Sequence, residues 1–236
     1  MKKILFILSA GLFVISTSLN AQRKKSKEET KEQVVTTPPK KKSPSYSDFV
    51  TKNTTSDKGL FTVHENKDSY LYEIPTSYFG KEMLLVTRIR ELPSGLGGGY
   101  VNAGSKTNTQ VVVWEHYKNK ILLKVKSYNA IANDSLPIYK SVKANNLEPI
   151  IYAFDIKSQN NDSTAVLVDV TSFFSTDVKA ISALSTSFRT QYKVRRLDPS
   201  RSFINSIKSY PENIEVVQDF TFEADAPPSN DAAGTI

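Results

Sequence analysis

The chain contains only two histidines, and they limit any metal or acid–base chemistry. His64 opens the run HENKD, which starts like the zinc-peptidase motif H-E-x-x-H, but the fifth residue is Asp68 rather than histidine. That motif also needs a helix to place both histidines on one face, whereas residues 60–74 alternate like two strands around a turn. His116 lies in a valine-rich strand pattern. We therefore interpret both histidines as structural or solvent-facing, and we assign no metal ligand.

Nucleophilic catalysis is equally restricted, because the sequence has no cysteine. The nucleophile would have to be a serine or threonine activated by His64 or His116. No G-x-S-x-G elbow is present to expose such a serine. The carboxylates of Glu115, Asp155 and Asp169 lie in strand patterns, where ordinary alternation accounts for them. We assign no catalytic residue. The lack of cysteine also excludes disulfides and thiolate metal sites.

Two further stretches are candidates for anion binding. Residues 92–108, LPSGLGGGYVNAGSKTN, hold five of the nine glycines. A phosphate-binding loop needs a following helix and a fixed spacing to Lys-Ser or Lys-Thr, but residues 109–117 alternate like a strand. We interpret the glycines as a hairpin loop. Arg195 and Arg196 are interpreted as a local ion pair with nearby Asp198 or Glu212 rather than as an anion site.

The elements that would position any site are antiparallel hairpins. Tyr70, Tyr72 and Ile74 alternate with other residues in a strand that Pro75 ends, because proline has no N–H for a central ladder. Residues 110–117 and 120–128 form the strongest hairpin, and residues 149–156 with 164–170 form another. The apolar run from residue 83 to 90 predicts a central strand. We expect a mainly β fold, sandwich- or barrel-like, with a few short helices; a β-rich α+β fold is the second choice.

Local signals also predict one loop and one helix. Residues 51–59 (TKNTTSDKG) are polar and predict a loop. Asp198 can be the N-cap of a helix whose first residue is Pro199, and Phe203, Ile204 and Ile207 would then share one face. We therefore expect a helix over residues 199–208, ended before Pro211.

The N-terminus has the layout of a secretory signal peptide. Two lysines precede an apolar run at residues 4–15, and a small-residue stretch leads to a cut between Ala21 and Gln22. The alternative, a membrane anchor, is disfavoured because the apolar run is shorter than the ~20 residues that span a bilayer. We expect an exported protein (periplasmic, cell-envelope or extracellular) with no membrane span after signal removal.

The net charge of +7 does not indicate a nucleic-acid partner. Residues 22–42 carry eight Lys and Arg against three Glu, while residues 43–236 carry 21 basic and 21 acidic residues. A nucleic-acid-binding protein carries its basic face on the folded part. We expect a signal peptide at 1–21, a disordered basic linker at 22–45, a short leading domain at 46–92 and a β-rich domain at 93–236. Residues 234–236 read like the start of a further strand, which predicts a truncated chain.

Several segments resemble the N-terminal region of a family of large secreted bacterial zinc-dependent metalloproteases. They are GLFTVHENKDSYLYEIPTSYFGKEMLLVTRIRE, NTQVVVWEHYKNKILLKV, PIIYAFDI and RRLDPSRSFINSIKSYPENIEV, and the likeness runs from about Tyr46 to the C-terminus. The resemblance implies that a short domain and a longer β-rich domain, both of undetermined role, precede a catalytic domain with an H-E-x-x-H-x-x-G-x-x-H-type zinc motif. This sequence contains none of that motif, so no zinc ligand or general base is carried over to it.

The resemblance implies a non-catalytic region whose partner is the catalytic domain of the same polypeptide. It would pack on that domain, assist its folding or shield its cleft, and zinc would be bound only by the catalytic domain. The alternative is a stand-alone cell-envelope module that binds peptide or glycan, with Tyr100 and the glycine-rich loop as its contact surface. Continuation of the reading frame into the zinc motif would favour the first hypothesis, and a stop codon the second.

Overall fold

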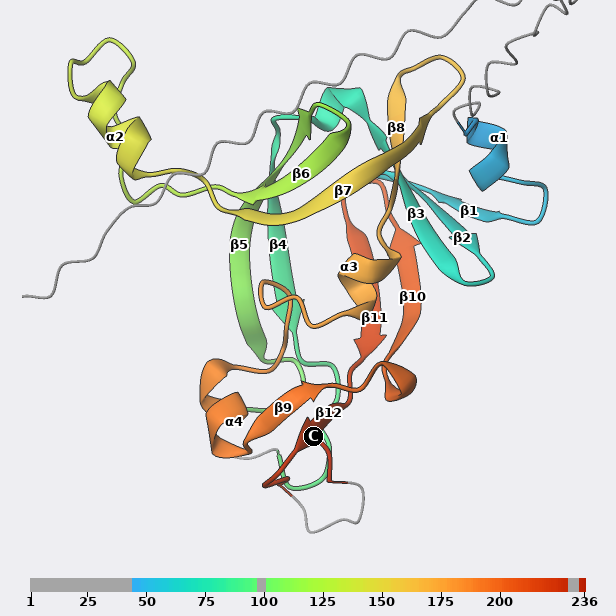
Figure 1. Ribbon diagram of the computed structural model, residues 1–236, viewed down its shortest axis with the longest axis vertical. Coiled ribbons are helices and arrows are strands. Elements are labelled where there is room, and N and C mark those ends of the chain that lie inside the picture. The colour runs from blue at the N-terminus through green and yellow to red at the C-terminus, as the bar shows by residue number, and fades with distance from the viewer. Residues whose placement is uncertain (1–43, 97–100, 229–233) are drawn as a thin grey trace, which may run out of the picture. The chain divides into compact units, whose positions relative to one another are not determined.

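Antiparallel hairpins pair into one eight-stranded sheet in the computed structural model (Figure 1). The structure describes residues 44–96, 101–228 and 234–236. The strand order is β1-β2-β3-β8-β7-β6-β5-β4, and every pairing is antiparallel. The predicted mainly β fold with a few short helices is therefore confirmed. The strands are β1 (Thr55–Lys58), β2 (Thr62–Asn66), β3 (Ser69–Pro75), β4 (Glu82–Arg88), β5 (Lys106–Tyr117), β6 (Lys120–Val125), β7 (Ile150–Gln159) and β8 (Ala165–Asp169).

The centre of the sheet joins strands that are far apart in the sequence. β3 pairs with β2 on one side and with β8 on the other, nearly a hundred residues later. Pro75 is the last residue of β3 and lies opposite Ala165, as expected of a proline at the end of a central strand. The β5–β6 hairpin turns at Lys118, which adopts a left-handed φ of 55°. Local sequence patterns predict the end of β3 at Pro75 and the β5–β6 turn, whereas the pairing of β3 with β8 was not predicted.

A separate hairpin, β10 (Phe203–Ser209) with β11 (Ile214–Asp219), packs against the start of the sheet. Two hydrogen bonds join its turn to the segment before β2. Leu60 N–H donates to Tyr210 O at 2.7 Å, and Ser209 Oγ donates to Phe61 O at 2.7 Å. The approach is so close that a Cβ at Gly59 would lie 2.5 Å from Tyr210 O. Only glycine fits at position 59, because the neighbouring atoms are mostly backbone.

The main core lies between the sheet and this hairpin. It is built from aromatic and β-branched side chains of β2, β3, β5, β6, β7 and β8, with Ile207 from β10. Phe61 makes edge-on ring contacts with Tyr72, Tyr78 and Trp114 at centroid distances of 5.6–5.9 Å. Such edge-to-face pairs add to the stabilisation from burial, so this aromatic group is the centre of the fold.

The remaining elements are short. A second, smaller cluster forms around Phe222 and Ala224 of β12 (Phe222–Ala224), which pairs with β9 (Val194–Leu197). Ile236 belongs to it, because its N–H and C=O exchange hydrogen bonds with Phe222. The helices are α1 (Tyr46–Phe49), η1 (Thr76–Tyr78), α2 (Tyr139–Asn145), α3 (Thr171–Ser175), α4 (Thr186–Gln191) and η2 (Pro199–Arg201).

The predicted helix over residues 199–208 is wrong. Asp198 does cap Pro199 by accepting from Ser200 N–H at 2.9 Å, but the helical turn ends at Arg201 and β10 follows. Phe203, expected on the buried face, is 56% exposed. Pairing with β11 outweighs the local helical pattern, because it buries Ile207 and satisfies a whole strand of backbone groups.

Two other strand assignments also differ from the sequence analysis. The predicted loop at residues 51–59 contains β1, which its polar sequence does not signal and which forms by pairing with β2. The predicted central strand at residues 83–90 is β4, which lies at the edge of the sheet. Its exposure alternates instead of being continuous: Leu84 is 65% exposed and Val86 38%. The apolar character of β4 is therefore not explained by burial on both faces.

Several expectations fall outside the described residues. They are the signal peptide at 1–21 with its cut between Ala21 and Gln22, nearly all of the linker at 22–45, and Tyr100. None of the helices in the described part has the length and apolar character needed to cross a bilayer.

Candidate functional site

A buried histidine connects four successive elements. His64 on β2 is 3% exposed, and its Nδ1 lies 2.8 Å from Ser56 Oγ on β1. Its Nε2 lies 3.0 Å from Glu73 Oε2 on β3, and the same oxygen accepts a 2.8 Å hydrogen bond from Tyr46 OH on α1. The antiparallel register produces these contacts: Ser56 lies directly opposite His64, and Glu73 is its diagonal neighbour across β3.

Hydrogen bonds within this cluster shift the pKa values of Glu73 and Tyr46 in opposite directions. The hydrogen bond to the His64 imidazole holds the pKa of the Glu73 carboxyl below its usual range, against the effect of burial, and the Tyr46 hydroxyl adds to the lowering. Burial and the bond to Glu73 raise the pKa of Tyr46 far above its usual range. At neutral pH the cluster therefore holds an ionised carboxylate and a protonated phenol.

We expect this cluster to make the protein acid-sensitive through Glu73. Because its pKa is lower in the folded state than the usual 4.5, its contribution to stability is present above pH 4.5 and is lost as the pH falls through the folded-state value. Urea unfolding of the wild type and of Glu73→Gln should therefore converge as the pH is lowered from about 6 to about 3. A difference between them that stays constant with pH would contradict this expectation.

Ser56, His64 and Glu73 have the residue types of a serine–histidine–carboxylate triad. Catalysis would also require a substrate cavity beside the serine and donors for the oxyanion. The cleft described below is lined by neither Ser56 nor His64. The serine also lies on the edge strand β1, where its hydroxyl completes a cross-strand contact. We interpret the cluster as a structural anchor for α1, β1, β2 and β3.

The second histidine lies apart from this cluster. His116 near the end of β5 is exposed and stacks on Phe79 at a centroid distance of 6.2 Å. Within residues 44–96, 101–228 and 234–236, no three His, Asp or Glu side chains gather in a group that could hold a metal ion.

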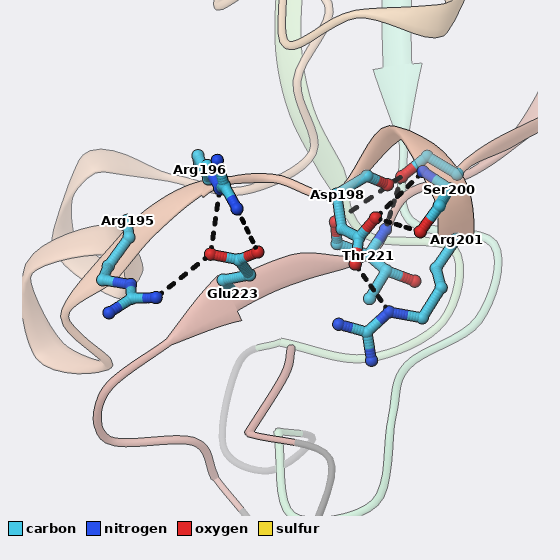
Figure 2. A network of polar contacts seen from close by, with 8 residues as sticks. Arg195, Arg196, Asp198, Ser200, Arg201, Thr221 and Glu223 are labelled. Atoms are coloured by element: carbon cyan, nitrogen blue, oxygen red, sulfur yellow. Dashed lines mark hydrogen bonds and ion pairs between the residues drawn. The ribbon is translucent and has the colours of Figure 1, made fainter.

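The paired arginines share the carboxylate of Glu223 (Figure 2). Arg196 donates twice to Glu223, at 3.0 and 2.8 Å, and Arg195 donates to the same side chain at 3.2 Å. These bonds lower the pKa of Glu223, and they follow from the β9–β12 pairing, which places Glu223 opposite Arg196. The arginines thus form local ion pairs, as predicted, but their partners are Glu223 and, for Arg195, also Asp225 at 3.4 Å, rather than Asp198 or Glu212.

Asp198 forms a separate turn beside this pair (Figure 2). Its carboxylate accepts from the hydroxyl and N–H of Ser200 and from Arg201 Nε at 2.7 Å. These hydrogen bonds lower the pKa of Asp198 to about 2. The carboxylate is satisfied locally, so the segment acts as a turn between β9 and β10 rather than as a binding site.

A cleft of about 880 Å³ lies between β4 and β11. β4 contributes all of its residues from Glu82 to Arg88, and β11 contributes most of its length from Ile214 to Asp219. The floor is apolar and includes Phe61, Trp114 and Leu123 of the main core. One end is closed by the smaller cluster, with Leu96, Phe222 and Ile236 in its wall.

The rim of this cleft is charged and mixed in sign. Lys81, Arg88 and Arg90 face it together with the carboxylates Glu82, Glu91, Glu212 and Asp219. An apolar floor inside a polar rim is the usual composition of a site that receives a protein surface. None of its lining residues is arranged as a nucleophile with a base. Its apolar floor and charged rim make the cleft the candidate binding site among the described residues.

Sequence reasoning missed this cleft because the two strands that form it are 126 residues apart at their closest. Its one local signal was the run MLLVTR in β4, which contains more apolar residues than an edge strand with one buried face needs. That excess was interpreted as a central strand. The other contact surface considered from the sequence, Tyr100, lies outside the described residues.

The comparisons with known proteins concern domain families. A family model described as "Domain of unknown function (DUF5117)" matches residues 104–236, and one described as "Domain of unknown function (DUF5118)" matches residues 43–92. The two matched stretches share one sheet, since β4 pairs with β5 and β3 pairs with β8. Neither the curated proteins nor the solved structures gave a match.

Proposed function

Since this chain belongs to the family of the domain of unknown function DUF5117, we propose its role from its residues and from the cleft. It is the non-catalytic N-terminal region of an exported zinc-dependent metallopeptidase. The cleft between β4 and β11 receives the catalytic domain of the same polypeptide, which supplies the zinc site. The observation that carries this proposal is the apolar cleft, bounded by a charged rim and by an edge strand with exposed apolar side chains.

The chemistry of the described residues supports a non-catalytic role. A zinc peptidase uses three protein ligands and one open position for water. His64 is engaged on both ring nitrogens, by Ser56 and by Glu73, so neither nitrogen is left to bind a metal. The segments that resemble the metalloprotease family correspond to β2–β4, β5–β6, β7 and β9–β11. Of these strands, β3, β4, β5, β6 and β11 supply lining residues of the cleft.

The side chains of β4 support docking of a protein rather than of a small molecule. Leu84 and Val86 are exposed at the rim, and Leu85 and Met83 face the core. Large aliphatic side chains left exposed on an edge strand favour association with another polypeptide. A domain that covers this edge would remove Leu84 and Val86 from water and so gain hydrophobic stabilisation.

We expect the apolar rim to be covered in the full-length protein. Hydroxyl-radical footprinting should find Leu84 and Val86 oxidised at least about threefold more slowly in the full-length polypeptide than in the 236-residue chain. Val86→Arg should restore rapid oxidation of Leu84 in the full-length protein, because it places a charge in the apolar contact. Leu147→Arg is the matched control, since Leu147 is 84% exposed and lies outside the cleft.

Two results would contradict this proposal. One is equal oxidation of Leu84 and Val86 in the two forms of the protein, which would mean that nothing docks on the rim. The other is peptide cleavage by the purified 236-residue chain, abolished by a chelator and restored by zinc, which would mean that this region is itself catalytic.

The alternative is a stand-alone cell-envelope module that binds peptide or glycan. The open cleft favours a peptide over a glycan, because its floor is aliphatic as well as aromatic and its charged groups lie at the rim. The coding sequence after Ile236 separates the two proposals: the first needs a zinc motif in the same reading frame, and the alternative needs none.

A further inference from the structure

The outer edge of β4 presents backbone hydrogen-bonding groups to the cleft. Lys126 N–H donates to Val111 O, so the backbone groups of Val111 face β6. Leu84 is the residue opposite Val111 in the β4–β5 pair. In an antiparallel pair the bonded residues alternate, so the N–H and C=O of Leu84 face away from β5. By the same alternation, those of Glu82 and Val86 also face outward, and within the described residues β4 pairs with β5 alone.

The outer edge of β11 also presents backbone N–H and C=O groups that face away from its partner strand. Tyr210 N–H donates to Asn213 O at 2.8 Å across the hairpin turn, which makes that pair a bonded one. Ile214 lies opposite Ser209 and Val216 opposite Ile207, so alternation makes these pairs non-bonded. The backbone groups of Ile214 and Val216 therefore face away from β10. Both residues also line the cleft.

The two edges run in the same direction. The chain leaves β4 toward Leu96, and it leaves β11 toward Phe220 and Phe222, and all three residues belong to the smaller apolar cluster. At the opposite end, Tyr78 precedes β4 and Glu212 precedes β11. One extended segment placed between the two edges can therefore be antiparallel to both, which is the better-bonded arrangement.

The composition and length of the cleft suit a single strand. β4 has seven residues and β11 has six, so at about 3.3 Å per residue the edges are about 20–23 Å long. Side chains on one face of an inserted strand would meet the floor at Trp114 and Phe61, and those on the other face would meet water and the charged rim. This requires apolar and polar residues to alternate along the segment.

We propose that the cleft binds an extended segment of the docking polypeptide by strand addition, with backbone hydrogen bonds to β4 on one side and to β11 on the other. This inference rests on the proposed docking function and specifies its occupant: a segment of about six residues that is apolar at alternate positions. Two unpaired edges facing one apolar floor explain why β4 combines an edge position with a core-like sequence.

The test separates backbone bonding from side-chain contact with two variants of one residue. Leu84→Pro removes both the leucine side chain and the outward N–H, whereas Leu84→Thr removes the side chain and keeps the N–H. Neither breaks a β4–β5 hydrogen bond, so both should fold, as checked by circular dichroism. The probe is the sequence enriched from a phage-displayed random decapeptide library on the wild-type chain, measured as a capped fluorescent peptide. Leu84→Pro should weaken its binding about tenfold more than Leu84→Thr.

A second measurement on the wild-type chain covers the case in which Leu84→Pro fails to fold. Two N-methylated versions of the probe are made, one methylated at the odd amides and one at the even amides. Each should bind at least about tenfold more weakly than the unmethylated probe, because each set of amides faces one of the two strand edges. Strand addition is overturned if no peptide is enriched, if the enriched peptides lack alternation, or if N-methylation has no effect. If these peptide experiments fail but footprinting still finds Leu84 protected in the full-length protein, strand addition is wrong and the proposed docking function is retained.

Discussion

Phe61→Ala is expected to lower the free energy of unfolding by about 3–5 kcal/mol. Phe61 is 2% exposed, and its ring is the common partner of Tyr72, Tyr78 and Trp114. Removing it leaves a cavity between the sheet and the β10–β11 hairpin and removes three edge-to-face contacts at once. The surrounding strands are held by ladders on both sides, so they cannot close the space fully. Urea unfolding at neutral pH measures the loss.

The matched control for this substitution is Phe203→Ala. Phe203 is a phenylalanine of β10 that is 56% exposed, so its removal should change the free energy of unfolding by no more than about 0.5–1 kcal/mol. Similar losses for the two variants would mean that the aromatic group around Phe61 is not the centre of the core.

His64→Leu is expected to lower the free energy of unfolding by about 2–3 kcal/mol, because it leaves a buried carboxylate without one of its hydrogen-bond partners. The substitution removes one of the hydrogen-bond partners of the Glu73 carboxylate and the contact to Ser56 on β1. The loss is moderated because Tyr46 still donates to Glu73. It should be measured by urea unfolding at pH 7, where Glu73 is ionised.

Two comparisons make this expectation specific. His116→Leu removes the other histidine, which is exposed, and should change stability by no more than about 0.5 kcal/mol. Adding Glu73→Leu to His64→Leu should recover part of the loss, because removing both partners leaves no unsatisfied carboxylate. Equal effects of the two histidine variants would mean that the His64 cluster is not an anchor.

Local sequence patterns predicted the hairpins of this fold well. The alternation of Tyr70, Tyr72 and Ile74 led to β3, and the predicted hairpin of residues 110–117 and 120–128 left the turn at 118–119, where Lys118 adopts its left-handed φ. Both features depend on residues close together in the chain, since side-chain alternation and turn conformation are local properties. The mainly β class followed from the number of such hairpins.

Where the local sequence did not specify helix, strand or loop, pairing with a distant strand decided the secondary structure. Phe203, Ile204 and Ile207 suit a helix face as well as a strand, and pairing with β11 selected the strand. The polar segment with β1 had no strand signal of its own, yet it pairs with β2 and its Asp57 accepts from Ser209 N–H at 2.9 Å. Neither outcome depends on the neighbouring sequence alone.

For the candidate sites, too, the sequence identified single residues, whereas their contacts depend on the tertiary structure. His64 was identified from the sequence, but its contacts with Ser56, Glu73 and Tyr46 depend on strand register and on where α1 lies. The cleft could not be identified at all, because its walls, β4 and β11, are not bonded to each other. A strand is an edge strand when it has a neighbouring strand on one side only. This depends on the order of the strands in the sheet, which local sequence does not specify.

The sequence by itself determined that this protein is a mainly β chain with no cysteine and only two histidines, because composition and alternation are read directly from the residues. The tertiary structure alone decided that His64 is enclosed by hydrogen bonds and that β4 and β11 face one cleft, each with an edge that pairs with no other strand of the described residues. The physical reason is that burial and strand pairing are set by contacts between residues far apart in the chain. Such contacts outweigh local preferences once a whole sheet is assembled.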